Sequence, residues 1–149
     1  EDVYDQDDDS RSGVEWGCHG TSVDTETDIG TGAANTESIR DNNCKPKKNS
    51  SPSQTAADLC EAYKAYDDDG EVYDDWYLPS KDELKEMKTV LVDDTTDDYG
   101  FETNNNSVYW SSSQSGNNQA WRHGFGSSGS QGTAEKKNTN LVRPIRNIT

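Results

Sequence analysis

The chain is short of the residues that usually fill a protein core. Leu, Ile and Val are few, only 28% of the sequence is hydrophobic and the net charge is −15, a composition that by itself is typical of disorder. No apolar run approaches the roughly 20 residues of a membrane span, and the longest stretch of interest is Thr89 to Val92. We therefore expect no membrane insertion.

Basic residues are also scarce, and they are placed unevenly. Residues 1–102 hold 28 acidic residues against nine basic ones, a net of −19, whereas residues 103–149 hold Glu135 against five basic residues, a net of +4. An acidic body repels nucleic acid, and the weakly basic tail lacks the clustered Lys and Arg with interleaved aromatics that follow a phosphate backbone. We therefore expect no nucleic-acid partner, and we interpret the acidic excess as an aid to solubility.

Cysteine is limited to three positions, Cys18, Cys44 and Cys60. They allow one disulfide with one thiol left over, or none in a reducing compartment. If one bond exists, we favour Cys44 with Cys60, because Cys60 falls on an expected helix and Cys44 on the loop that leads into it. Cys18 and His19 are sequence neighbours whose side chains normally diverge, so a thiol nucleophile with its base is not indicated.

Metal and cofactor motifs are missing as well. No paired C-x-x-C or H-x-x-x-H spacing for zinc is present,, and in the run 67–70 an EF-hand alignment puts Ala65 first and Trp76 twelfth, which excludes that motif,. Two interpretations of this run remain. It is either a solvated helix end or a weak calcium site in a loop, with ligands from Asp67, Asp69, Asp74 or Asp75. The glycine-rich segments 30–32 and 124–126 are not phosphate-binding loops, because they lack the Gly-Lys-Ser/Thr ending of that motif,. We expect no cofactor, no metal and no catalysis.

Aromatics and glycine are what the chain does have. Four Trp, seven Tyr and twelve Gly allow a small aromatic core under long polar loops. At 149 residues the chain is one ordinary domain,. We assign residues 13–149 to that domain and residues 1–12, which are rich in Asp, to a flexible acidic N-terminus.

Two helices are expected in the first two thirds of the chain. One begins at Ser53 as N-cap, after an exposed linker at 45–53, and ends at 67–70; its core stripe is Ala56, Leu59, Cys60 and Tyr63,. The other follows Pro79, with Ser80 and Glu83 as a capping box and Leu84, Met87 and Leu91 on one face,.

After Gly100 the pattern changes to short strands. Strands are expected near 107–112 and 119–125, and a last one from 141 to 148 that Pro144 makes an edge or bends,. Trp121, His123 and Phe125 share one face of the second strand. Two helices followed by strands indicate an α+β fold, with the helices packed on a small, mostly antiparallel, twisted sheet.

Residues 104–130 have the composition of binding loops. They combine Asn, Ser, Gly, Tyr, Trp, Arg and His with no acidic residue. Rigid aromatics serve as anchors in such loops, and small polar residues serve as adaptable donors and acceptors. A plain polar hairpin region is an equally good interpretation on composition alone.

Several segments, taken in order, resemble the Lcl C-terminal domain family, which is related to the C-type lectin fold of formylglycine-generating enzymes. The segments are EWGC at 15–18, IGTGAANT at 29–36, DWYLPS with Glu83 and Leu84 at 75–84, YWSSS at 109–113, AW at 120–121 with Phe125, and VRPIR at 142–146. They span nearly the whole chain from residue 13.

The resemblance implies a C-type lectin-like fold with Trp76, Leu78, Trp110 and Trp121 in the core and with Arg143 and Arg146 as buried or semi-buried anchors. In that superfamily the enzymatic branch works through cysteines in its C-terminal part. Here no cysteine follows Cys60, so the catalytic role does not carry over.

Proteins of this fold also serve as variable proteins of diversity-generating retroelements, and the region at about 104–140 is similar to their diversified segment. In such proteins diversification replaces adenines in AAY codons, where Y is C or T. Changes of the adenines alone cannot turn these codons into codons for Trp, Gln, Glu, Lys or Met. The framework would then be Trp110, Gln114, Gln119, Trp121, Gln131, Glu135, Lys136 and Lys137. The ligand-facing positions would be Ser115, Asn117, Asn118, Arg122, His123, Ser127, Ser128 and Ser130,.

The resemblance therefore implies a binding domain displayed on a virion or cell surface, or secreted, that takes a protein or glycan ligand. Arg122 is the strongest candidate, because it points away from the face of Trp121 and because Arg is enriched where binding energy concentrates. His123 is alternatively a partly buried histidine. The other hypothesis is a structural or adhesive extracellular module of the same fold, which binds through its acidic face with or without calcium. The oligomeric state is left open.

Overall fold

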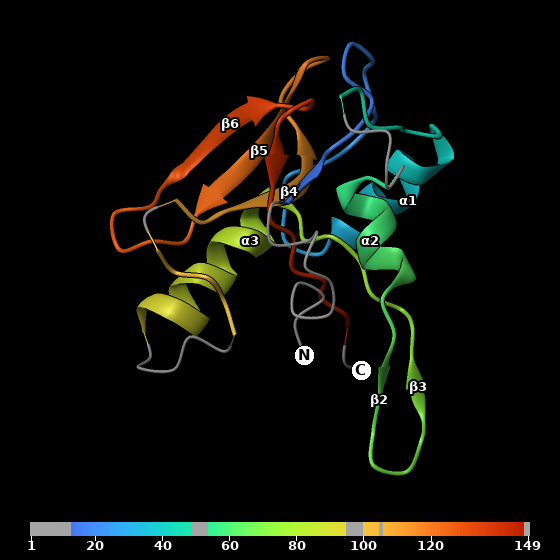
Figure 1. The fold of residues 1–149 in the computed structure, drawn as a ribbon, viewed down its shortest axis with the longest axis vertical. Helices are drawn as coiled ribbons and strands as arrows, with labels where there is room; N and C mark the ends of the chain where they lie inside the picture. Colours follow the sequence, from blue (N-terminus) through green and yellow to red (C-terminus); the bar gives the residue numbers. More distant parts are fainter. Residues whose placement is uncertain (1–12, 49–53, 95–99, 105, 148–149) are drawn as a thin grey trace.

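The computed structural model describes residues 13–48, 54–94, 100–104 and 106–147; the acidic N-terminus expected at 1–12 lies outside them. The fold is α+β, as expected (Figure 1). The helices are α1 (Gly32–Asp41), α2 (Ala56–Ala62), α3 (Lys81–Lys88) and the π-helical turn η3 (Thr89–Asp93). The strands are β1 (Val14–Glu15), β2 (Ala65–Tyr66), β3 (Val72–Tyr73), β4 (Val108–Gln114), β5 (Gln119–Gly124), β6 (Gln131–Glu135) and β7 (Thr139–Asn140).

Capping boxes begin two of the helices. Ser80 and Glu83 form the capping box of α3, as the sequence predicts, and Leu84 is buried on the inner face of that helix,. Helix α2 begins after Thr55, whose side chain accepts the Asp58 N–H while Asp58 accepts the Thr55 N–H. The expected cap at Ser53 is therefore two residues too early, and Ser53 itself lies outside the described residues.

Helix α1 is absent from the sequence-based prediction because its buried face is polar. Asn35 and Thr36 are buried, and Ile39 is the only large apolar side chain on that face. The Asn35 amide accepts the Glu26 N–H and donates to the Glu26 carbonyl. The Thr36 hydroxyl accepts the Leu78 N–H at 3.0 Å. Long-range hydrogen bonds therefore position this helix where a hydrophobic stripe would usually do so.

Strands β4, β5 and β6 form an antiparallel sheet in that order. The pairs Trp110–Arg122 and Arg122–Gly132 put those three residues on one face, and the Trp121–Thr133 pair lies on the other. Helix α3 covers the face of Trp121, where the Lys81 ammonium lies 4.3 Å from the indole centroid (Figure 1). The sequence predicted β4 and β5 but not β6.

The last strand, expected at 141–148, is wrong in its extent over residues 141–147, and residue 148 lies outside the described residues. Leu141 makes one isolated parallel bridge to Tyr109, and Ile145 makes one antiparallel bridge to Tyr77. Pro144 stands between the two and has no N–H to donate, so a continuous ladder cannot form there. The paired segment is the short β7, which lies against β1.

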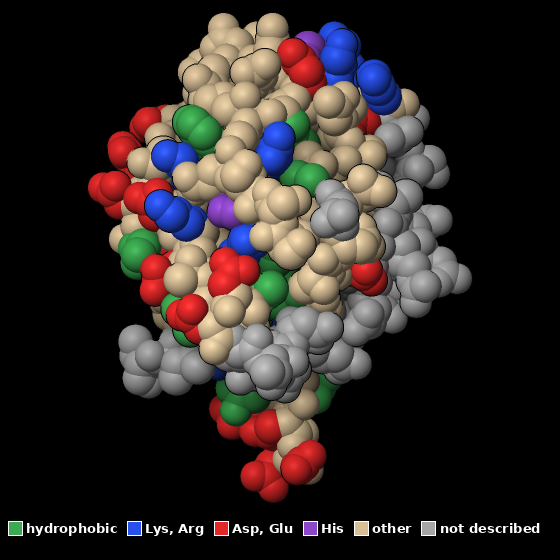
Figure 2. Space-filling model, turned by 90° about the vertical axis from the view of Figure 1, so that its left-hand side faces the viewer, with side chains coloured by type: hydrophobic (Ala, Val, Ile, Leu, Met, Phe, Trp, Pro, Cys, Tyr) green, Lys and Arg blue, Asp and Glu red, His purple; other side chains and the backbone are tan. Residues whose placement is uncertain are grey.

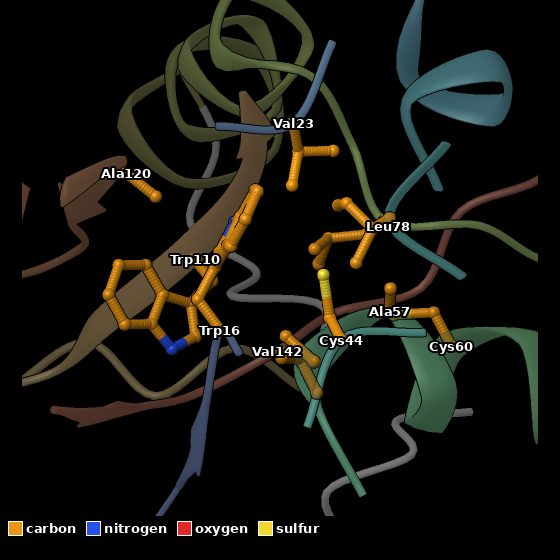
Figure 3. Close-up of a cluster of buried hydrophobic side chains, with 11 residues drawn as sticks. Trp16, Val23, Cys44, Ala57, Cys60, Leu78, Trp110, Ala120 and Val142 are labelled. Carbon is orange, nitrogen blue, oxygen red and sulfur yellow. The ribbon is translucent and has the colours of Figure 1, made fainter. Parts of the chain in front are cut away.

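The main core cluster gathers side chains from α1, α2, β4, β5 and the connecting segments. Figure 3 shows the indole rings of Trp16 and Trp110 beside Leu78, Val142 and other small apolar side chains. Trp16 Nε1–H donates to the Ser111 carbonyl, and Trp110 Nε1–H donates to the Val14 carbonyl. A second cluster joins Leu84, Phe101, Tyr109, Phe125 and Leu141.

Two of the expected core tryptophans are only half-buried. Trp110 and Leu78 are fully buried as expected, but Trp121 lies on the sheet face under Lys81, and Trp76 packs at the base of the β2–β3 hairpin. The second fully buried tryptophan is Trp16.

The disulfide joins Cys18 and Cys44, with 4.6 Å between the Cα atoms, so the expected Cys44–Cys60 pair is wrong. Cys18 has a φ of 50°, which is unusual for a residue with a side chain and brings its sulfur to Cys44. Cys60 is a thiol, fully buried on α2 in the main core cluster. Cys44 belongs to the same cluster, but its sulfur is bonded to Cys18.

Arg143 and Arg146 are half-buried anchors, in agreement with the expectation. The Arg143 guanidinium lies 4.3 Å from the Phe101 ring centroid. Arg146 makes two hydrogen bonds to Asp75 and stacks on Tyr73. Both contacts tie the C-terminal segment to earlier parts of the chain.

Candidate functional site

The eight positions that the sequence predicts to face a ligand fall into three groups along the β4–β6 sheet. Ser115, Asn117 and Asn118 lie in the turn 115–118 between β4 and β5. Ser127, Ser128 and Ser130 lie in the loop 125–130 between β5 and β6. Arg122 and His123 lie on β5 between them. The six residues of β5 span about 20 Å, so the structure does not bring all eight positions into one pocket.

The turn 115–118 is held by its backbone. The Ser115 N–H donates to the Gln119 carbonyl at 2.9 Å, and the Asn117 and Asn118 carbonyls accept the N–H groups of Gly20 and Lys136 at 3.0 and 2.8 Å. Ser115, Asn117 and Asn118 are exposed. Within the described part of the chain their side chains make no hydrogen bond, so they are available to a ligand.

Lys136 and Gln114 brace this turn from below. The fully buried Lys136 ammonium donates to the Thr21 carbonyl and to Gln114 Oε1, both at 2.9 Å, and lies 4.7 Å from the centroid of the Trp16 ring. Gln114 Oε1 also accepts the Val23 N–H at 2.8 Å. Burial lowers the pKa of Lys136 to about 8. Gln114 and Lys136, which the codon argument assigned to the framework, thus connect the N-terminal segment to the turn.

His19 forms a second connection that the sequence did not reveal. His19 Nε2 lies 2.9 Å from a Glu135 carboxylate oxygen, and Nδ1 lies 3.3 Å from the Lys47 ammonium. The hydrogen bond from His19 lowers the pKa of Glu135. Nothing in the local sequence pattern around His19 indicates a partner 116 residues away.

The loop 125–130 is shaped by two glycines and closed by backbone hydrogen bonds. The Gly124 N–H donates to the Ser130 carbonyl, and the Gly129 N–H donates to the Gly126 carbonyl. A side chain at position 129 would collide with the Gly124 backbone. Ser127, Ser128 and Ser130 are exposed, and their hydroxyls have no hydrogen-bond partner among the described residues.

Arg122 differs from the other described arginines. Arg40 pairs with Asp58 and Glu61, Arg146 pairs with Asp75, and Arg143 lies over Phe101. Among the described residues the Arg122 guanidinium donates only to the Ser130 carbonyl, at 3.2 Å. It lies against Gly132, where an added Cβ would be 3.0 Å from the arginine Cζ. Among the described residues it has no carboxylate partner.

His123 is buried, in contrast to the other proposed site residues. It is 7% exposed, and its ring meets the Phe125 ring edge-on with 5.9 Å between the ring centroids. Its Nδ1–H donates to the Gly124 carbonyl. Burial lowers its pKa. The alternative interpretation of a buried histidine therefore describes its position, and we leave His123 out of the candidate site.

Serine is used in two ways in this region. Ser111, Ser112 and Ser113 on β4 are fully buried, and each hydroxyl is hydrogen-bonded inside the protein. The turn serines, such as Ser115 and Ser127, are exposed. The same residue type is thus structural on the strand and outward-facing on the turns.

The molecular surface shows the same division. Figure 2 views the side that carries β6 and the loop 125–130, and its upper half is mostly tan, the colour of uncharged polar side chains and backbone. Red acidic side chains gather at the left edge, in the lower half of the view and on the β2–β3 hairpin at the bottom, and a few lie at the upper right. The acidic surface and the candidate site are therefore largely separate.

The carboxylates considered for calcium are partly engaged by the protein. Asp67 accepts the N–H groups of Asp69 and Glu71 and the Tyr73 hydroxyl, and these bonds lower its pKa. Asp75 is paired with Arg146. In the described residues no group of three or more His, Cys, Asp or Glu side chains is placed to hold a metal ion. No helix in that part of the chain has the length and apolarity to cross a membrane.

Residues 8–146 match the family model described as the Lcl C-terminal domain. Neither the curated proteins nor the solved structures contain a match to this chain. The matched range covers nearly all of the sequence and includes every element described above. The chain therefore belongs to the Lcl C-terminal domain family.

Proposed function

We propose that this domain is a non-catalytic binding module that takes a protein or glycan ligand on a target surface. The main support is a set of six exposed side chains that make no hydrogen bond within the described structure. They lie on two turns whose backbones are fixed by hydrogen bonds, and they are Ser115, Asn117, Asn118, Ser127, Ser128 and Ser130. Arg122 supplies a cation without a carboxylate partner in the described structure. Donors and acceptors of this kind bind a ligand at little cost in ordering, because the turns are already fixed.

The burial of the segment supports a variable protein of a diversity-generating retroelement with a C-type lectin-like fold. The framework positions include Trp110 and Lys136, which are fully buried, and Gln114, whose side chain is hydrogen-bonded to Val23, Ser22 and Lys136. Most reachable positions are exposed. Diversification limited to reachable positions would therefore change the surface and leave the scaffold intact.

The cysteines favour binding over catalysis and an extracellular location. Cys18 and Cys44 are joined in a disulfide, and Cys60 is buried in the core, so a solvent-accessible thiol nucleophile is not offered. Disulfides persist mainly in oxidising environments. We accordingly propose a domain displayed on a virion or cell surface, or secreted.

An adhesive module that acts through its acidic face is the second candidate. The β2–β3 hairpin projects from the body (Figure 1). It exposes Tyr66 and Val72, which are 67% and 44% accessible and are paired across the strands. Asp68, Asp69 and Glu71 lie exposed in its turn. An exposed apolar pair beside acidic groups suits an adhesive contact with a cationic partner.

The test compares two triple variants of the whole chain on a glycan array and on a panel of purified surface proteins. The first variant replaces Asn117, Asn118 and Arg122 with Ala. The matched control replaces Asp68, Asp69 and Glu71 with Asn, Asn and Gln. We expect the first to lose binding at least tenfold, with a nearly unchanged melting temperature, and the control to bind like the wild type.

The reverse result, with binding lost only in the hairpin variant, would support the adhesive module. Unfolding of the first variant would show that its three residues are scaffold. Comparison of several gene copies is an independent check, because variation confined to about 104–140 supports the retroelement assignment and uniform drift contradicts it.

A further inference from the structure

Strand β6 has one free hydrogen-bonding edge. The bonds Gly124 N–H to Ser130 and Lys136 N–H to Asn118 set the phase of the β5–β6 ladder. In an antiparallel pair the bonded residues alternate, so Gly132 and Ala134, opposite Arg122 and Ala120, direct their backbone groups toward β5. The N–H and C=O of Gln131 and Thr133 and the N–H of Glu135 then point away from the sheet.

No described segment covers this edge. Strand β6 ends the sheet order, and Figure 1 shows it as the outermost strand of the three. The opposite edge of the sheet is closed, because Trp110 N–H donates to the Leu141 carbonyl and Leu141 N–H donates to the Val108 carbonyl. The two edges of one small sheet are therefore unequal.

The β6 edge also lacks the features that usually protect such strands. Lys, Pro and bulges commonly prevent edge strands from pairing with other chains. Residues 131–135 read Gln-Gly-Thr-Ala-Glu and pair with β5 in unbroken register over all five residues. The single charged residue, Glu135, is held by His19. Gly132 and Ala134 are small, so a further backbone can approach closely.

Arg122 adds a chemical preference to this edge. Its guanidinium already lies over Gly132, and an added strand would lie about 4.8 Å beyond β6. A side chain of that strand next to Gly132 on the same face would lie within reach of the guanidinium. Because Arg122 has no carboxylate among the described residues, an Asp or Glu fits this position.

We propose that the β6 edge binds an extended segment of a protein ligand, which joins the sheet as a fourth strand with an acidic residue beside Gly132. The inference rests on the proposed binding function and selects a polypeptide as the ligand class. Addition of a strand supplies affinity through main-chain hydrogen bonds and specificity through alternate side chains. The turns at the two ends of β6 would contact the ends of the added strand.

The experiment selects peptides from a displayed library of random nine-residue sequences against the whole chain, and it measures their Kd by fluorescence polarisation. Thr133→Pro removes one outward N–H and leaves the β5–β6 ladder intact, because proline is tolerated at an edge position that faces solvent. Thr133→Val is the matched control, since it changes the side chain and keeps the N–H.

We expect selected peptides to carry Asp or Glu at one fixed position and to bind Thr133→Pro about tenfold more weakly, with Thr133→Val within about twofold of wild type. Arg122→Gln should remove most of the preference for the acidic peptide over its amide analogue. A second arm leaves the protein unchanged and methylates alternate peptide nitrogens. One alternate set should abolish binding, and the other should leave it intact.

Selected peptides that bind Thr133→Pro as tightly as Thr133→Val and tolerate both methylation sets would overturn the inference, as would a selection that yields no peptide. The proposed function is tested separately. Glycan or protein binding that is lost in the Asn117, Asn118 and Arg122 variant but unaffected by Thr133→Pro would retain the binding module and refute strand addition.

Discussion

At the scale of single residues, Trp16 and Trp110 are the largest fully buried side chains of the main core cluster, and each indole N–H has a backbone acceptor. Replacement of either by Ala removes that packing and leaves a cavity. We expect a loss of about 3–5 kcal/mol in the free energy of unfolding, measured by urea denaturation.

Trp121→Ala is the informative comparison. Trp121 is half-buried under Lys81 on the sheet face, so its truncation should lower stability clearly less than Trp110→Ala. The family resemblance implied that Trp110 and Trp121 both lie in the core, so it did not distinguish the two. Equal losses for the two variants would contradict the assignment of the core.

Lys136 makes stability depend on pH in a predictable direction. Burial lowers its pKa from 10.5 to about 8, so between these values the unfolded chain keeps a proton that the folded chain releases. The contribution of Lys136 to stability therefore rises with pH through this window. We expect the stability of the wild type relative to Lys136→Met to increase by about 1–2 kcal/mol between pH 7.5 and 9.5, measured by urea denaturation at both values.

A stability difference that stays constant over this range would show that the buried ammonium remains charged in the folded protein. Its two oxygen acceptors and the Trp16 ring would then compensate its burial more fully than the lowered pKa implies.

At the scale of the elements, the disulfide connects the segment after β1 to the segment after α1. It closes a loop between residues 26 positions apart, and loop closure of this length stabilises the folded state by about 3.5 kcal/mol in the chain-entropy description. The double variant Cys18→Ser, Cys44→Ser should lose roughly this amount in urea denaturation. Cys60→Ser should leave the disulfide present by mass spectrometry under non-reducing conditions.

The elements that the sequence predicted are those with local signals. Helix α3 has a capping box and an apolar face in consecutive residues, and β4 and β5 have large aromatics at alternate positions. Helix α1 and strand β6 have neither. Asn35 is positioned by Glu26 and by Ser112, which is 77 residues away, and β6 is a strand because β5 pairs with it.

The candidate site was predicted in composition but not in arrangement. The exposure of Ser115, Asn117 and Asn118 follows from their small polar side chains in a turn. The separation of the two turns by the length of β5, the burial of His123 and the bracing by His19 depend on which segments meet in space. Cys18 likewise reached Cys44 through a positive φ that no spacing rule indicates.

At the scale of the whole molecule, the net charge of −15 should make the fold sensitive to ionic strength. Like charges repel across a Debye length of about 10 Å at 0.1 M salt, and this repulsion is stronger in the compact state. We expect sodium chloride to raise the melting temperature by a few degrees between low and moderate concentration, measured by calorimetry. A flat or falling melting temperature would mean that ion pairs such as Arg146 with Asp75 outweigh the repulsion.

The two turns at opposite ends of β5 share no side chain and are separated by about 20 Å of strand. Effects of substitutions at such distances usually add without coupling. A population of variants can therefore improve each turn independently, and two modest gains found separately combine by multiplication of their affinity factors. The division of the surface into two separate patches makes the domain easy to evolve toward a new target, because no improvement at one end has to await a compatible change at the other.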